Sequence, residues 1–466
     1  MRWQPPVDTS LASEVIGVAL SSGADFADLF VEDRSESALT FLDGRVKDAV
    51  SGQSLGAGIR VVHGQRAIYG YTSDLSRAGL LEVARAVASA EQGRSGTVVA
   101  REATATAPGL VHPVGRYPGD VPMQRRIDLF HLVDRTARAY SSFISQVEVS
   151  LAETVQNVLI ANSEGLHVCD ERPYSRFFIK AIATGGGERQ EGHRSPGRLA
   201  GFEFVDSLEV EELAREAAEA AVLMLSADYC KAGRMPVVID KGFGGVIFHE
   251  ACGHLLETTS VAPRVSILSD KMGQQIAHPA VTAIDDGTLE NEWGSLGVDD
   301  EGMPVQRTVL IREGILESYM VDRLGEIKTQ QYARTGSARR QSYRQPPGSR
   351  MRNTFIAPGD ASLEELIADV PLGLYAKRMG GGSVKPGTGD FNFAVREAYM
   401  IRDGKLAEPV RGAMLIGNGA DILMKISKVG RDLELAAGMC GSVSGNVPVT
   451  VGQPALLVDE ITVGGR

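Results

Sequence analysis

Residues Phe243–Glu257 read Phe-Gly-Gly-Val-Ile-Phe-His-Glu-Ala-Cys-Gly-His-Leu-Leu-Glu, and this stretch decides how the rest of the chain is interpreted. Apart from the final glutamate, its only clearly polar side chains are His249, Glu250 and His254, so a helix here would be apolar almost all round and therefore buried. Buried polar groups need partners. Two neutral imidazoles can bind a divalent metal, and a neighbouring carboxylate can take a proton from bound water. The stretch predicts a metal site on a buried helix; the alternative is two core histidines bonded to backbone carbonyls.

The two histidines are five residues apart, whereas the common zinc-protease pattern His-Glu-x-x-His separates them by four. In a regular helix, five residues rotate the side chains about 140° apart. One wide π-type turn would bring both rings onto one face, and such bulges gather at functional sites. The backbone yields most easily at Gly253, so we expect the π-type turn there.

A catalytic zinc site takes three protein ligands and leaves one position open. Glu257 could supply a carboxylate, or it could be a surface charge at the end of the helix. Cys252 is expected to pack as a small apolar residue. Cys440 lies among small residues that let the backbone approach closely, and a thiolate suits zinc. Spacing alone leaves the third ligand open.

The length, net charge and cysteine content of the chain limit its possible domain organisation and cellular compartment. A chain of 466 residues exceeds what one core organises, so we expect an N-terminal α+β domain over 1–230 and a C-terminal domain with the metal site over 231–466. The formal net charge of -11 argues against nucleic-acid binding. Four scattered cysteines fit reduced thiols, and no run approaches the roughly 20 apolar residues of a membrane span. We therefore expect a cytoplasmic protein that binds neither nucleic acid nor membrane.

Short strand-like runs broken by a polar residue and a glycine predict β-hairpins at five places. Few strand–helix–strand alternations accompany them, so mainly antiparallel sheets flanked by helices are expected, and the fold class is α+β. The predicted turns are His63-Gly64, Asp43-Gly44, Glu164-Gly165, Glu313-Gly314 and Asp403-Gly404.

Several motifs of the chain together point to one known family. They are Gly56–Val61 with Gly70-Tyr71, Phe248–Glu257, Asp299–Gly302, Thr335–Ser337, Arg339–Tyr343, Arg350–Thr354, Gly387–Phe393, Gly438–Gly441 and Val447–Pro454. They resemble the TldD branch of the TldD/PmbA family of metalloproteases, once described as modulators of DNA gyrase. The resemblance extends from about residue 10 to the C-terminus and is most specific after residue 230. The sequence departs from the family pattern at Cys252, where a small residue without a thiol is expected, and at Ser349, where proline is expected.

The resemblance implies a zinc-dependent metallopeptidase in which His249, His254 and Cys440 bind Zn²⁺ and Glu250 is the catalytic base. It also implies an assembly, either a heterodimer with a PmbA/TldE-like subunit or a homodimer. Short or unfolded peptides would be cut in the cavity that the two subunits enclose. Microcin maturation and antitoxin degradation are roles of the family.

Two further groups of residues are candidates for substrate binding. Gly381 and Gly382 would let an extended peptide approach the backbone and bind as an added β-strand. Arg339, Arg340 and Arg350 could hold a peptide carboxylate, or they could form salt bridges within loops.

One competing function belongs to another class of protein. A non-proteolytic modulator or assembly protein, acting on a toxin–antitoxin pair or on gyrase, would hold a structural zinc. Such a site is usually closed by four protein ligands and has no use for Glu250 beside the first histidine. An amidase acting on a small molecule would share the peptidase chemistry and differ only in the shape of its cavity.

Overall fold

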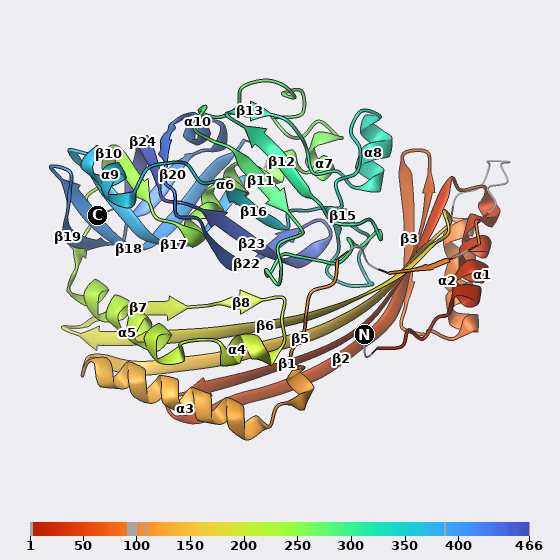
Figure 1. Cartoon of the computed structure of the whole chain (residues 1–466), viewed down its shortest axis with the longest axis horizontal. Helices are drawn as coiled ribbons and strands as arrows, with labels where there is room; N and C mark the ends of the chain where they lie inside the picture. The colour runs from red at the N-terminus through yellow and green to blue at the C-terminus, as the bar shows by residue number, and fades with distance from the viewer. Residues whose placement is uncertain (1–2, 91–99, 103, 108–109, 386–387, 466) are drawn as a thin grey trace.

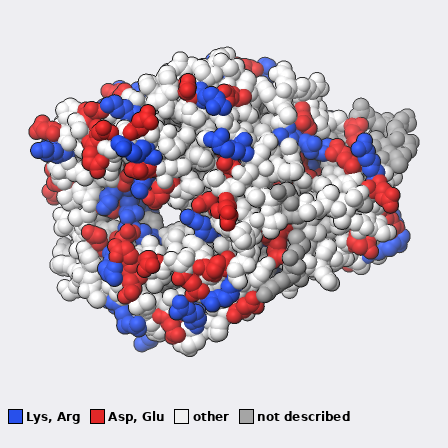
Figure 2. Space-filling view, viewed as in Figure 1, with Lys and Arg blue, Asp and Glu red and all other residues white. Residues whose placement is uncertain are grey.

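A computed structural model describes residues 3–90, 100–102, 104–107, 110–385 and 388–465 (Figure 1). Within these ranges, no helix combines the length and the apolar character needed to cross a membrane. All four cysteines carry free thiols, so they form no disulfide framework. On the face shown in Figure 2, acidic and basic side chains are interspersed rather than segregated.

The N-terminal half of the chain forms one eight-stranded sheet with very long strands (Figure 1). Its central strands β1, β2, β5 and β6 contain 17, 19, 19 and 20 residues, where about 3–10 is usual. The order is β3-β2-β1-β5-β6-β4, with β7 and β8 also paired to β6, and every pair except β4–β6 is antiparallel. The strands are β1 (Phe26–Leu42), β2 (Arg45–His63), β3 (Arg66–Thr72), β4 (Thr104–Thr106), β5 (Ile144–Asn162), β6 (Leu166–Gly185), β7 (Glu188–Arg194) and β8 (Gly197–Arg198).

Two groups of helices cover this sheet at opposite ends of its strands (Figure 1). Helices α1 and α2 close a core with the start of β1, whereas α3, α4 and α5 close a second core with its end. Because side chains alternate along a strand, Leu29 and Val31 face the first core, while Phe30 packs with Tyr343 of the C-terminal half. The helices are α1 (Thr9–Ala19), α2 (Arg77–Ser89), α3 (Met123–Tyr140), α4 (Phe202–Asp206) and α5 (Val210–Ser226).

The C-terminal half contains three more sheets, and among the described residues no strand from before Asp228 enters them. The largest has the order β17-β10-β24-β20-β18-β19-β9, with β21 on β24; the six-stranded sheet has the order β13-β12-β11-β16-β23-β22; β14 and β15 form a pair. The strands are β9 (Asp228–Tyr229), β10 (Gly233–Ile239), β11 (Ala283–Asp286), β12 (Arg307–Arg312), β13 (Ile315–Leu316), β14 (Ala338–Arg339), β15 (Gly348–Ser349), β16 (Asn353–Ile356), β17 (Leu372–Lys385), β18 (Asp390–Arg402), β19 (Lys405–Arg411), β20 (Met414–Asn418), β21 (Ile426–Val429), β22 (Glu434–Ser442), β23 (Gly445–Gln453) and β24 (Leu456–Gly464).

Antiparallel pairing predominates, so the predicted α+β class is confirmed. In the described part of these sheets, three strand pairs are parallel: β10–β17, β9–β19 and β16–β23. The short helices of this half are α6 (Val246–Ala251), α7 (Thr258–Val261), α8 (Arg323–Thr329), α9 (Leu363–Ala368) and α10 (Gly419–Met424). The change of sheet falls near the expected domain boundary at residue 230, which stays a prediction.

All five predicted hairpin turns are present, between β1 and β2, β2 and β3, β5 and β6, β12 and β13, and β18 and β19. In the first of them, Asp43 and Gly44 have φ values of 49° and 77°. Glu313-Gly314 and Asp403-Gly404 likewise have positive φ at both residues, whereas at His63-Gly64 and Glu164-Gly165 only the glycine does. Two consecutive residues with positive φ match the right-handed twist of the flanking strands, which explains the polar residue followed by glycine in three of the turns.

The central helix is shorter than predicted. Helix α6 ends at Ala251, Cys252 has φ -134° and ψ -43°, and a 3₁₀ turn follows over Gly253–Leu256. The prediction of one helix with a π-type turn is therefore wrong, and only His249 and Glu250 of the three polar residues lie in α6. A break at Cys252 re-aims the chain, so the second histidine escapes the 140° rotation of a regular helix. Gly253 allows this path because a Cβ there would collide with the Sδ of Met351.

A fully buried ion pair connects three segments around the central helix. Arg352 donates from Nε to the Asp285 carboxylate at 2.7 Å and from Nη1 to the carbonyls of Thr335 and Gly336 at 3.0 and 2.7 Å. Neither side chain of the pair is exposed. The guanidinium thus fixes β11 to the loop before β14.

We expect Arg352→Met to lower the free energy of unfolding by about 3–5 kcal/mol, because it leaves the Asp285 carboxylate buried without its cation. The matched control is Arg402→Met, which removes a half-exposed arginine paired with Glu408 and is expected to cost less than about 1 kcal/mol. Urea unfolding of the two variants measures the difference. Equal losses would contradict the importance of the Arg352–Asp285 pair.

Candidate metal centre

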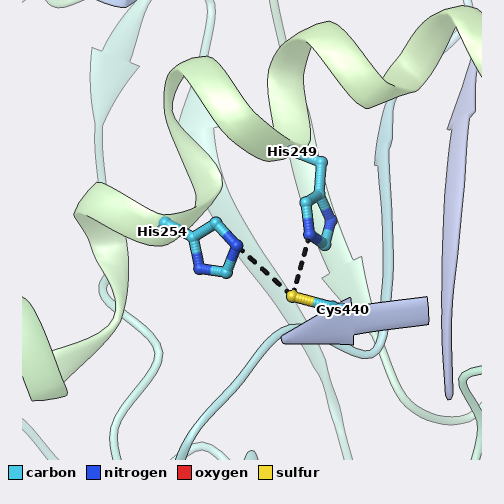
Figure 3. Close-up of side chains that lie close together, drawn as sticks. All are labelled: His249, His254 and Cys440. Atoms are coloured by element: carbon cyan, nitrogen blue, oxygen red, sulfur yellow. Dashed lines mark hydrogen bonds between the residues drawn. The ribbon is translucent and has the colours of Figure 1, made fainter. Parts of the chain in front are cut away.

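His249, His254 and Cys440 converge on one point from three different elements (Figure 3). The Cys440 Sγ lies 3.2 Å from the His249 Nε2 and 3.3 Å from the His254 Nε2, and the three ligand atoms are all within 4.8 Å of one another. His249 comes from α6, His254 from the 3₁₀ turn after it, and Cys440 from β22. The fold therefore brings together the three residues expected as ligands.

A close backbone approach places Cys440 under the histidines. The turn Gly242–Gly245 leads into α6 and packs on β23, and a Cβ on Gly245 would collide with the backbone of Gly452. Strand β22 pairs with β23 along its whole length, with Cys440 opposite Val447. Glycine at position 245 is therefore what lets α6 approach the strand pair that carries the thiol.

Arg350 also fixes this strand pair, through three hydrogen bonds. Its Nη2 donates to the carbonyl of Cys440 at 2.6 Å, and its Nη1 donates to the carbonyl of Gly445 at 2.7 Å and to the Ser444 Oγ at 3.0 Å. The side chain is completely buried. These bonds fix the backbone of the thiol-bearing residue.

Glu257 orients the second histidine. Its Oε2 lies 3.1 Å from the His254 Nδ1, and its Oε1 accepts a hydrogen bond of 3.3 Å from the backbone of Met351. The carboxylate is only 1 % exposed, so it is not a surface charge. It is also not one of the three clustered ligand atoms, which come from His249, His254 and Cys440. A carboxylate on Nδ1 leaves Nε2 directed at the cluster, which is the usual support of a metal-binding histidine. Sequence reasoning missed this role, although an acid three residues after the histidine was a signal for it.

The electrostatics of the cluster favour a thiolate. Burial alone raises the pKa of the Cys440 thiol, but the positive charges of His249 and His254 and their hydrogen bonds outweigh burial and lower that pKa to about 5. Burial lowers the pKa of His254, yet Glu257 and Cys440 outweigh it and raise this pKa well above its ordinary value. A thiolate is the form of cysteine that binds a metal, whereas a protonated His254 has to release its proton before its Nε2 can bind one.

The donor set fits a small, borderline-soft divalent ion. Two ligand atoms bound tetrahedrally at about 2.0–2.3 Å from one ion lie roughly 3.5 Å apart, close to the observed Sγ–Nε2 separations of 3.2 and 3.3 Å. Two imidazole nitrogens and one thiolate also leave a fourth position open. The residues present therefore fit a metal centre of the catalytic type.

Glu250 lies beside the ligand atoms. Its Oε2 is 3.9 Å from the His254 Nε2, and its side chain is 24 % exposed. Within the described part of the chain, no lysine or arginine forms an ion pair with it. The carboxylate is thus free to accept a proton next to the cluster.

The residues expected to bind substrate are not members of the cluster of three ligand atoms. Arg350 makes the backbone bonds given above, and Arg339 donates from Nη1 to the carbonyls of Met351 and Pro448. Arg340 donates to the Asp300 carbonyl at 2.8 Å. All three arginines are buried, whereas Gly381 and Gly382 are exposed on β17. Their roles in substrate binding stay predictions.

The two positions that depart from the family pattern are both buried and well packed. Burial raises the pKa of the Cys252 thiol far above its ordinary value, which suits a small apolar residue. Ser349 donates from Oγ to the carbonyl of Met320 at 2.5 Å and accepts from the backbone of Thr258 at 3.3 Å. Neither position belongs to the cluster of ligand atoms.

Three family models match successive parts of the chain. They are described as PmbA/TldA metallopeptidase domain 1 over residues 27–90, the central domain over 116–225 and the C-terminal domain over 232–465. A metalloprotease TldD homolog of Haemophilus influenzae is 38% identical and covers 98% of this chain and 97% of its own. A metalloprotease of Methanothermobacter thermautotrophicus is 32% identical, with 98% and 99% covered.

Two solved structures share the fold at low sequence identity. TldE from Thermococcus kodakarensis superposes with a TM-score of 0.75 at 16% identity, covering 98% of this chain and 100% of its own. A Thermotoga maritima protein described as a candidate modulator of a DNA gyrase superposes with a TM-score of 0.79 at 20% identity, covering 98% and 99%.

The lowered pKa of Cys440 predicts a thiolate that survives mild acid. In metal-free protein, the thiolate absorbance at 240 nm is expected to be present above pH 5 and to disappear as the pH falls through about 5, whereas an ordinary thiol titrates near about 8.5. Subtracting the titration of Cys440→Ser isolates this group. A midpoint near 8.5 in the difference curve would refute the assignment.

Proposed function

The chain belongs to the PmbA/TldD family of metallopeptidases, and from this premise we propose that it is a zinc peptidase of the TldD type that hydrolyses short or unfolded peptides. His249, His254 and Cys440 would hold the zinc, since two imidazoles and a thiolate suit this ion. When bound, zinc polarises a peptide carbonyl and lowers the pKa of a water molecule toward 7. Side chains of this protein would carry out the proton transfers and keep the ligands in position.

The position of Glu250 is the observation that supports this proposal most directly. Its carboxylate lies 3.9 Å from the His254 Nε2 and has no lysine or arginine partner among the described residues. From this position Glu250 would take the proton of the attacking water at a carboxylate oxygen and then pass it to the leaving amine. Glu257 would keep the His254 ring in place through both proton transfers.

Glu250→Gln keeps the shape of the side chain and removes the proton acceptor. We expect the variant to bind about one zinc per chain, like the wild type, and to cut an unstructured fluorogenic peptide about 10²–10⁴ times more slowly. The control is Glu408→Gln, which changes an exposed glutamate on β19 and is expected to leave the rate unchanged.

The wild type and the Glu250→Gln variant should each be assayed alone and together with a PmbA-type subunit from the same source. We propose that this chain acts as a heterodimer with such a subunit, or as a homodimer, in the cytoplasm. The structural likeness to TldE supports the pairing of related subunits within this fold. Activity that requires the mixture would support the heterodimer.

The competing function is a non-proteolytic modulator with a structural zinc. A protein of the same fold is described as a candidate modulator of a DNA gyrase, and this description supports the alternative. The free carboxylate of Glu250 beside an open metal position argues for the peptidase, because a structural site has no use for it. Zinc binding without peptide cleavage, even in the presence of the partner subunit, would favour the modulator.

Glu257→Gln tests the orienting role of the buried carboxylate. The variant retains a hydrogen-bond acceptor for His254 but removes the negative charge, so we expect zinc affinity to fall about 10–100-fold. Competition with a chromogenic chelator measures the affinity. An unchanged affinity would show that the His254–Glu257 contact does not support the metal.

A further inference from the structure

A cavity of about 310 Å³ lies behind the strand that carries Cys440. Successive side chains of β22 point to opposite faces, so Cys440 faces the histidines while Met439 lines the cavity. Figure 1 shows β22 and β23 lying between α6 and the long strands of the N-terminal sheet. Residues of β5 and β6, among them Gln156 and Tyr174, form the opposite wall. The cavity is thus separated from the metal centre by one layer of sheet.

The lining of the cavity carries far more positive than negative charge. It contains five arginines but a single acid, Asp300. That acid and Asp170 already neutralise Arg172, at 2.7 and 2.8 Å, and Glu36 pairs with Arg34. Three arginines therefore remain without a carboxylate at ion-pair distance among the residues described: Arg176, Arg339 and Arg340.

These three arginines are held in place by neutral groups only. Arg176 donates to the Ser195 Oγ at 2.9 Å and stacks 5.7 Å from the Trp293 ring. Arg340 donates to the Asp300 carbonyl, and its buried Nε has no hydrogen-bond partner. Arg339 and Arg340 are each 3% exposed. Burying an unpaired charge is costly, and burial lowers the pKa of both Arg176 and Arg339. An anion that entered the cavity would relieve this cost.

We propose that the cavity binds the C-terminal carboxylate of a peptide, as a site separate from the metal centre. The planar guanidinium matches a carboxylate and donates two hydrogen bonds to it. The same cavity offers the amides of Gln156 and Asn446 for a peptide bond, and the apolar surfaces of Trp293 and Met439 for a terminal side chain. A bare inorganic anion would use none of these groups.

The size and the opening of the cavity suit the end of a peptide. Its volume is at the lower end of the roughly 300–1,000 Å³ of small-molecule sites, so it has room for one or two terminal residues. Met439 is 53% exposed, so one wall reaches the surface. The choice of a peptide as ligand rests on the proposed function, whereas the anion site rests on the arginines alone.

The test measures binding in zinc-loaded Glu250→Gln protein, so that failure of catalysis and failure of this site are observed separately. The probes are N-acetyl-dialanine, its C-terminal amide and inorganic phosphate, and the readouts are titration calorimetry and the fluorescence of Trp293, one of two tryptophans in the chain. We expect the free acid to bind at least about tenfold more tightly than the amide or phosphate.

Two variants locate the binding in this cavity. Met439→Glu places a competing carboxylate beside the arginines, and Arg176→Gln removes one cation; each is expected to weaken binding of the free acid at least about tenfold with zinc content unchanged. Met424→Glu, at an exposed methionine of α10, is the matched control. Equal binding of acid and amide, or binding that neither variant affects, overturns the proposal. Phosphate binding as tightly as the free acid overturns the assignment to a peptide.

Discussion

The buried guanidinium of Arg350 connects both ends of the candidate metal centre. One of its nitrogens holds the carbonyl of Cys440, and its Nε lies 3.8 Å from the Glu257 carboxylate that orients His254. Cys440 and His254, two proposed ligands that are 186 residues apart in sequence, are therefore positioned by a single side chain. A charge this deeply buried is stable only with such partners. The geometry of the cluster thus depends on one arginine that touches no ligand atom.

The N-terminal sheet serves the site indirectly, by holding the loops that surround it. Buried ion pairs join Arg60 of β2 to Glu301 at 2.8 Å and Arg172 of β6 to Asp300 at 2.7 Å. The Glu32 carboxylate of β1 accepts the backbone N–H of Tyr343 at 2.8 Å. The motif Asp299–Gly302 is therefore part of the junction between the two halves of the chain. This junction also creates the arginine-lined cavity, because both of its walls meet there.

Much of the fold could be predicted from local sequence. Hairpin turns depend on two adjacent residues, so Asp43-Gly44 and Asp403-Gly404 were recognisable without tertiary information. The break at Cys252 was not recognisable from local sequence, because the next residue, Gly253, lies directly against the side chain of Met351 from a distant loop. The boundary of a short helix is a compromise between its own hydrogen bonds and such contacts. The pattern of residues alone therefore favoured the wrong kind of turn.

The sequence by itself determined the chemistry that is available: two histidines and a glutamate in an apolar stretch, and a cysteine among small residues that can approach them. These assignments rest on residue type and short-range spacing. Only the tertiary structure decided that Glu257 is buried against Met351 and Arg350, that Arg350 fixes the backbone of Cys440, and that three cavity arginines have no carboxylate partner among the described residues. These facts depend on contacts between residues dozens to hundreds of positions apart, and such contacts arise only when the sheets pack against one another.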